Sequence, residues 1–151
     1  MSSPISATPK PKLIDSPPQD TVLIVSAGII ERDDGAILIA RRPPDAWMAG
    51  YWEFPGGKLE PGETPEECLA REIREELSVD AEVGAIFLVK IHAYPDFRVL
   101  LLFYRCRLAG GEPPGLSRGG LEYAWARPEN LPAYDFLPAD EDVIQRILGL
   151  D

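Results

Sequence analysis

The chain has few of the residues from which many catalytic sites are built. It contains one histidine, His92, and two cysteines, Cys68 and Cys106, among 151 residues. No second histidine or paired nucleophile accompanies His92, so we expect a packed or surface side chain and not a catalyst. The cysteines form no CxxC pair and no disulfide-rich pattern. We expect both to be small buried side chains of a protein in the reducing cytoplasm.

Long apolar runs and positive charge are scarce as well. No stretch of about 18 apolar residues is present, which excludes a membrane-spanning helix on length. Lysine and arginine number 15 against 25 acidic residues, which gives a net charge of −10. Such a chain repels polyanions, so neither a nucleic-acid polymer nor a membrane is expected as a partner. A small anion can still bind through local positive groups or a metal ion.

The length leaves room for one domain. Residues 1–20 hold five prolines and lack the apolar stretch of a signal peptide. We therefore expect a disordered tail over residues 1–20 and a single domain over residues 21–151. Nothing in the sequence indicates the oligomeric state or a role for the tail.

The pattern of turns and apolar runs predicts a mixture of strands and helices. Runs at 22–30 and 36–40 flank the turn signal Asp33-Asp34-Gly35 and predict a β-hairpin. The segment from Arg41 to Gly62 is rich in proline and glycine and is a candidate ligand-binding loop. Further strands are expected at 85–91, 99–107 and 121–125, a turn at 110–120 and a last helix at about 139–148. The expected fold is α/β of the α+β type, with a mixed sheet flanked by two helices.

The start of the first helix is specified in detail. Thr64 is the expected N-cap, Pro65 the first helical residue, and Glu67 completes a capping box. An apolar stripe follows at Leu69, Ile73 and Leu77.

Three glutamates lie beside that stripe. Glu72, Glu75 and Glu76 are spaced i, i+3, i+4 and fall within an arc of about 100°. Each like-charged pair costs about 0.2–0.5 kcal/mol, and only Arg71 offers local relief. Converging carboxylates are what Mg²⁺ or Mn²⁺ prefers as ligands. Taken alone, the cluster could equally be a solvated acidic face.

A longer motif decides between these readings. The chain has the residues of the Nudix box at every specified position but one: Gly57, Glu63, Arg71, Glu72, Ile73, Glu75, Glu76 and Val79. Chance agreement in one window has a probability on the order of 10⁻⁸. The flanking residues, Arg41-Arg42 and 52–58, resemble the MutT branch, and the resemblance runs from about Ser26 to Leu148. The exception is Ser78, where the family has glycine; a left-handed conformation there costs about 1–2 kcal/mol.

The resemblance implies a hydrolase that cuts a phosphoanhydride bond in a nucleotide, with Mg²⁺ as cofactor and Mn²⁺ as a substitute. By position, Glu72, Glu75, Glu76 and the carbonyl of Gly56 would hold the metal. Gly57, Glu63 and Arg71 would support the motif structurally. Glu122 matches another family carboxylate near the metals, or is a solvent-facing strand residue. The general base is Glu72 or Glu122, and we favour Glu72.

Other residues are expected at the substrate. Arg42 and, less directly, Lys58 would contact phosphates, although Arg42 could instead form a surface salt bridge. Glu53 and Phe54 would contact substrate or brace the loop. Asp140 matches an asparagine that reads the oxidised purine in 8-oxo-dGTP hydrolases. An ionised aspartate only accepts hydrogen bonds and suits cytosine, whereas burial could keep it protonated; it could also be a helix N-cap.

These residues lead to one hypothesis with several alternatives. The first is hydrolysis of (8-oxo-)dGTP to the monophosphate and pyrophosphate. The alternatives are a CTP or modified-dCTP pyrophosphohydrolase, an ADP-ribose or dinucleotide pyrophosphatase, for which Pro95 is a weak marker, and a non-catalytic nucleotide-binding module. The intact glutamates argue against the last, since a pure binder does not need mutually repelling charges.

Overall fold

The computed structural model describes residues 21–110 and 122–150. The expected tail at 1–20 and all but the first residue of the expected turn at 110–120 lie outside these ranges. In chain order the strands are β1 Val22–Ile30, β2 Ile37–Arg41, β3 Trp52–Glu53, β4 Gly56–Lys58, β5 Ala81–Ala93, β6 Arg98–Leu108 and β7 Glu122–Ala126. The α-helices are α2 Pro65–Leu77 and α3 Glu141–Ile147, and two 3₁₀ helices are η2 Pro128–Ala133 and η3 Pro138–Asp140.

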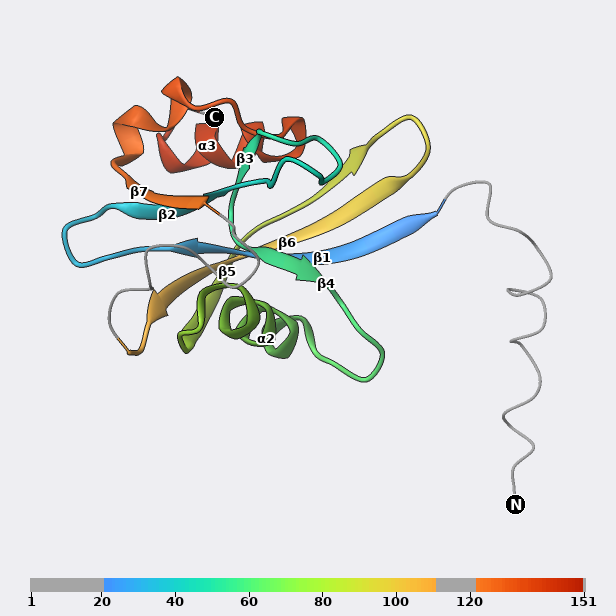
Figure 1. Ribbon diagram of the computed structural model, residues 1–151, viewed down its shortest axis with the longest axis horizontal. Coiled ribbons are helices and arrows are strands. Elements are labelled where there is room, and N and C mark those ends of the chain that lie inside the picture. Colours follow the sequence, from blue (N-terminus) through green and yellow to red (C-terminus); the bar gives the residue numbers. More distant parts are fainter. Residues whose placement is uncertain (1–20, 111–121, 151) are drawn as a thin grey trace, which may run out of the picture.

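The strands form two sheets. The first has the order β4-β1-β6-β5 and is mixed, because β1 and β6 are parallel while the other neighbours are antiparallel. The second, β3-β2-β7, is antiparallel. Figure 1 shows α2 on one side of the first sheet and α3 on the other side, near the second sheet. The expected α+β fold with a mixed sheet and two helices is confirmed, with a second sheet in addition.

The predicted β-hairpin is right in its turn and wrong in its pairing. Gly35 has φ +88° and donates its amide to the carbonyl of Arg32, as a tight turn requires. Yet β1 and β2 share only the bridge between Glu31 and Ile37 and then enter different sheets. The burial explains this, because 37–40 are buried on both faces, which is typical of a central strand.

The helix α2 follows its sequence signals closely. Thr64 Oγ1 accepts from the amide of Glu67 at 3.1 Å, and the Glu67 carboxylate accepts from the amide of Thr64 at 2.9 Å, so the capping box is complete. Ser78 ends the helix in the left-handed conformation, with φ 59° and ψ 32°. The predicted apolar stripe is fully buried, in a cluster with residues of the first sheet and Leu38 of the second: Ile30, Leu38, Leu69, Ile73, Leu77, Tyr104 and Cys106.

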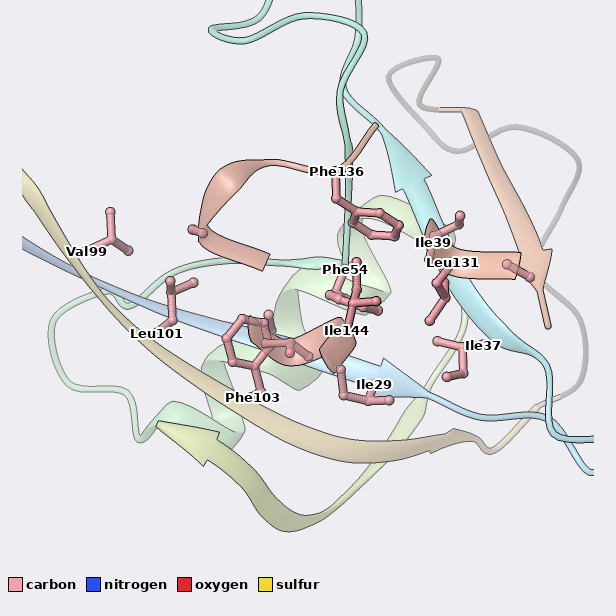
Figure 2. Packing of buried hydrophobic residues seen from close by; sticks show 14 residues of the cluster. Ile29, Ile37, Ile39, Phe54, Val99, Leu101, Phe103, Leu131, Phe136 and Ile144 are labelled. Carbon is pink, nitrogen blue, oxygen red and sulfur yellow. The ribbon is translucent and has the colours of Figure 1, made fainter. Parts of the chain in front are cut away.

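A second core fills the space between the sheets and α3. Figure 2 shows Phe54 at its centre, with Phe103 from β6, Phe136 and Ile144 around it. The ring of Phe54 lies 5.2 Å from that of Phe136 and 6.2 Å from that of Phe103. Phe54 is therefore a core residue, and its burial fixes the chain on either side of it, where Glu53 and Gly56 lie.

No helix in the described ranges is long and apolar enough to cross a membrane.

Candidate active site

One cavity of about 810 Å³ opens beside β4 and the N-terminal halves of the parallel strands β1 and β6. Its walls come from β3, β4, α2, the loop after β2 and the start of the C-terminal helical region. It brings together nine of the predicted site residues: Arg42, Glu53, Phe54, Gly56, Gly57, Lys58, Glu72, Glu76 and Asp140. Residues spread over about a hundred positions of sequence thus share one space.

Two glycines allow β4 to lie where it does. A Cβ on Gly56 would come within 2.7 Å of the Ala27 Cα on β1, the strand with which β4 pairs. A Cβ on Gly57 would come within 2.5 Å of both carboxylate oxygens of Glu72. Only a residue without a side chain leaves room for this carboxylate against the backbone of β4.

Arg71 links the acidic groups on and around α2. Its Nε donates to Glu63 Oε2 at 2.6 Å and its Nη2 to the carbonyl of Lys58 at 3.2 Å. Its Nη1 donates to Glu72 Oε2 at 3.0 Å and to Glu75 Oε1 at 3.1 Å. The hydrogen bonds from Arg71 lower the pKa of Glu63. Arg71 and Glu63 therefore join the helix to the loop before it.

The carboxyl groups of Glu53, Glu72 and Glu76 lie around the same cavity and repel one another when ionised. Burial, followed by repulsion from Glu72, Glu53 and Glu75, raises the pKa of Glu76 to about 8, against a hydrogen bond from the amide of Gly56. Burial also raises the pKa of Glu72, where Arg71 opposes the shift. Each shift expresses an unfavourable interaction of the ionised form, which a nearby cation would reverse.

The donor set fits a hard divalent cation, with one rearrangement. Glu72, Glu76 and the backbone of Gly56 line the cavity and supply oxygen ligands, the type that Mg²⁺ and Mn²⁺ favour. Within the described residues, however, no three acidic, histidine or cysteine side chains are grouped closely enough to share an ion. Glu75 does not line the cavity; its side chain is 58% exposed and bound to Arg71. For Glu75 to serve as a third ligand, its side chain would have to leave Arg71 and turn toward the cavity.

Arg42 forms a salt bridge inside the cavity wall. Its Nη1 donates to both carboxylate oxygens of Glu53, at 3.1 and 3.2 Å, and its Nε donates to the carbonyl of Trp47 at 2.5 Å. Burial raises the pKa of Glu53, and Arg42 opposes that shift. Both side chains are largely covered, so the pair is not a surface ion pair. A contact between Arg42 and a phosphate stays a prediction.

Glu122 lies outside this cavity. It is 3.6 Å from the guanidinium of Arg41, both side chains are about half exposed, and it lines a smaller cavity of about 450 Å³ with Arg41 and Arg42. Its approach to the metal ligands stays a prediction. Of the two candidates for the general base, Glu72 is the one that lines the main cavity.

Asp140 is the most deeply buried acid in the described ranges. It is 4% exposed, and its Oδ2 has no hydrogen-bond partner. Asp140 occupies the N-cap position of α3, as one interpretation expected, but its side chain makes no capping hydrogen bond. Burial, and then the charge of Glu53, raises its pKa well above the ordinary value, against a hydrogen bond from the amide of Phe54. Burial therefore favours the protonated form of this carboxyl group, which can donate a hydrogen bond as well as accept one.

Comparison with known proteins decides the family. The NUDIX domain model matches residues 26–146. The chain belongs to the Nudix family. This Nudix protein is 38% identical over 128 residues to the 8-oxo-dGTP diphosphatase of Escherichia coli (strain K12), covering 85% of this chain and 98% of that protein. It is 35% identical over 138 residues to the CTP pyrophosphohydrolase of the same organism, covering 83% and 91%.

A solved structure agrees with this Nudix assignment. The MutT protein from Methanosarcina mazei Go1 has a TM-score of 0.77 to this chain at 26% identity, over 88% of this chain and 97% of that one. The resemblance drawn from the Nudix box is thereby confirmed for the family, the fold and the hydrolase class.

The sequence interpretation missed three aromatic residues of the Nudix cavity. Trp47 from the loop after β2, and Tyr94 and Phe97 from the turn between β5 and β6, line its wall. The sequence offered one signal, a tryptophan in a loop rich in proline and glycine.

His92, by contrast, does not line the cavity; it packs beside Tyr94 at 4.5 Å between rings. Both cysteines are buried and unpaired, as expected.

Proposed function

We propose that this Nudix hydrolase is a Mg²⁺-dependent nucleoside triphosphate pyrophosphohydrolase that converts 8-oxo-dGTP, and dGTP, to the monophosphate and pyrophosphate. The observation that carries the proposal is that one cavity joins the acidic end of α2 to the buried carboxyl group of Asp140, whose Oδ2 has no hydrogen-bond partner. The first can serve a phosphate chain through a cation, and the second can hydrogen-bond a base. The 38% identity to an 8-oxo-dGTP diphosphatase supports the same substrate.

The acidic end of the cavity would bind the metal ion and the phosphates. Glu72, Glu76, the Gly56 carbonyl and a rotated Glu75 would hold the ion, while Lys58 adds positive charge for the phosphates. Nudix hydrolases depend in general on divalent metals; the bound ion would neutralise phosphate charge and acidify the attacking water. Glu72 accepts the proton of that water as general base, with Gly57 and Arg71 fixing its position. Water adds to phosphorus, and one phosphoanhydride bond breaks to leave the monophosphate and pyrophosphate.

Asp140 favours the purine over the cytosine alternative. A neutral carboxylic acid donates to the O6 acceptor of guanine as asparagine does, so the aspartate at this position does not disqualify 8-oxo-dGTP. A CTP pyrophosphohydrolase remains the second candidate, on the 35% identity to an enzyme of that name and because an ionised Asp140 would suit the cytosine amine.

The substrate is tested with a panel of nucleotides. The full chain is incubated with 8-oxo-dGTP, dGTP, CTP and ADP-ribose in Mg²⁺, in Mn²⁺ or in EDTA, and products are separated. We expect pyrophosphate and 8-oxo-dGMP as the fastest products, with Mn²⁺ replacing Mg²⁺ and EDTA abolishing release. If CTP were hydrolysed fastest, or if ADP-ribose yielded monophosphates fastest, that nucleotide and not 8-oxo-dGTP would be the substrate. Binding without any metal-dependent turnover would make the protein a sensor.

Two variants at Asp140 separate the purine and cytosine alternatives. Asp140→Asn keeps a donor and should retain 8-oxo-dGTP turnover within about threefold, whereas Asp140→Ala should lose about 10- to 100-fold, the value of a hydrogen bond in a buried site. If Asp140→Asn instead lowers CTP turnover selectively, the ionised form reads cytosine.

The proposed partners are small nucleotides, with no nucleic-acid polymer. Two buried, unpaired cysteines support the reducing cytoplasm as the compartment. The division into a tail at 1–20 and a catalytic domain from residue 21 is part of the same proposal.

A further inference from the structure

An aromatic group forms one wall of the cavity, away from the glutamates of α2. The Trp47 ring lies 5.0 Å from that of Tyr94 at an interplanar angle of 84°, and 5.7 Å from that of Phe97. Tyr94 and Phe97 are 5.2 Å apart and belong to one tight turn, in which the Tyr94 amide donates to the Phe97 carbonyl at 2.8 Å. Two loops about fifty residues apart in sequence therefore meet through these rings.

The Trp47 side chain is fixed by its neighbours, but about half of its surface is exposed. It is 53% exposed although it touches two other rings and lines the cavity. Its carbonyl accepts from Arg42 Nε, and Arg42 is fixed in turn by Glu53 inside the cavity. A tryptophan serving packing alone would be covered, because its large apolar surface gains stability only when it is removed from water.

The backbone around Trp47 is unusual in a way that supports a functional role. Met48, the next residue, has φ 56°, which is sparsely populated for a residue other than glycine, and Gly50 has φ 84°. Arg41 Nε donates to the Gly50 carbonyl at 3.0 Å and holds the loop in this shape. Strained backbone that is fixed by its surroundings is concentrated at ligand-binding sites.

The aromatic wall adjoins the acid that would read the base. Asp140 lines the same cavity, and the hydroxyl of Tyr94 lies near enough to interact with its carboxyl group and with the backbone of Ala139. A planar ligand whose edge reaches Asp140 therefore comes beside the aromatic group, while Glu72 and Glu76 serve the phosphate end.

We propose that Trp47 stacks on the nucleobase and biases the enzyme toward purine over pyrimidine nucleotides. Base–aromatic stacking needs only a π-face, so every base gains from it. A two-ring purine overlaps an indole more fully than a one-ring pyrimidine does, and the gain is larger. The inference rests on the proposed function, and it assigns selectivity to a loop outside the Nudix box.

The test compares Trp47→Ala and Trp47→Phe with a control from the same loop. Tyr51→Ala removes an exposed aromatic side chain that does not line the cavity. In Trp47→Ala we expect the KM for 8-oxo-dGTP to rise about 5- to 100-fold, the range for loss of a stacked ring, with kcat nearly unchanged. The KM for CTP should rise less, while Trp47→Phe should recover most of the affinity and Tyr51→Ala should resemble wild type.

A binding measurement gives a second readout that does not depend on turnover. Titration with dGMP should quench the tryptophan fluorescence of the wild type, and Trp47→Phe should remove most of that quenching although Trp52 and Trp125 remain. A wild type that hydrolyses no triphosphate would refute the proposed function itself. An active wild type with unchanged KM values in Trp47→Ala, or equal losses for purine and pyrimidine substrates, would overturn the stacking role alone.

Discussion

Replacing Gly57 by alanine tests how closely the backbone of β4 and the carboxylate of Glu72 must fit. The new Cβ would lie 2.5 Å from both carboxylate oxygens of Glu72. Nonbonded atoms normally stay about 3.5 Å apart, so the carboxylate must move by about 1 Å. Gly57 has no positive φ, so the backbone itself accepts alanine. The strain therefore falls on the end of a flexible side chain.

The expected result is a large loss of rate with a small loss of stability. A misplacement of about 1 Å in a reacting group can lower the rate about 100-fold. The disturbed contact between Arg71 and Glu72 is one link of a network, and its loss should lower stability by less than about 1 kcal/mol, a melting shift of about 2–4 °C.

The assay is steady-state release of pyrophosphate from 8-oxo-dGTP, with thermal melting measured on the same preparation. Gly110→Ala is the matched control, because a Cβ there meets nothing within 4 Å; it should keep both the wild-type rate and the wild-type melting temperature. A Gly57→Ala variant that retains the wild-type kcat would refute the claim that Glu72 acts from its observed position.

Two further predictions concern stability. Ser78→Gly should raise the melting temperature by about 2–4 °C with little change in rate, because relief of about 1–2 kcal/mol of left-handed strain exceeds the entropy that glycine adds to the unfolded chain; a destabilised variant would discard this reasoning. The pKa of Glu76 is raised to about 8 in the fold, so folding favours its protonated form, and stability in EDTA should fall as pH rises from about 4.5 to about 8. In Glu76→Gln, the free energy of unfolding measured with urea should depend less on pH across this range. An unchanged pH dependence would speak against the raised pKa of Glu76.

The features that the sequence predicted are those with local causes. The capping box at Thr64, the apolar stripe of α2 and the left-handed Ser78 depend on residues within a few positions of one another. The neighbourhood of Glu72 and Gly57 followed from the motif spacing. These parts of the fold and of the candidate site needed no knowledge of distant contacts.

The features that it did not predict depend on packing between distant segments. The separation of β1 and β2 into two sheets follows from burial of β2 on both faces, which a turn signal does not report. Arg42 binds Glu53 because the cavity wall buries both. Burial likewise raises the pKa of Asp140, which a position just before a helix does not reveal.

Glu72 and Glu76 have one proposed role, to bind a divalent cation that acts on a nucleoside triphosphate. Its most direct test is release of pyrophosphate from 8-oxo-dGTP by wild type and by Glu76→Gln, each titrated with Mg²⁺ from an EDTA-treated, folded preparation. We predict saturable activation of the wild type and a loss of at least about 100-fold in the variant, as expected when a metal ligand is removed. Equal turnover by the two proteins, or wild-type turnover that does not respond to Mg²⁺, would rule out this role for the two glutamates.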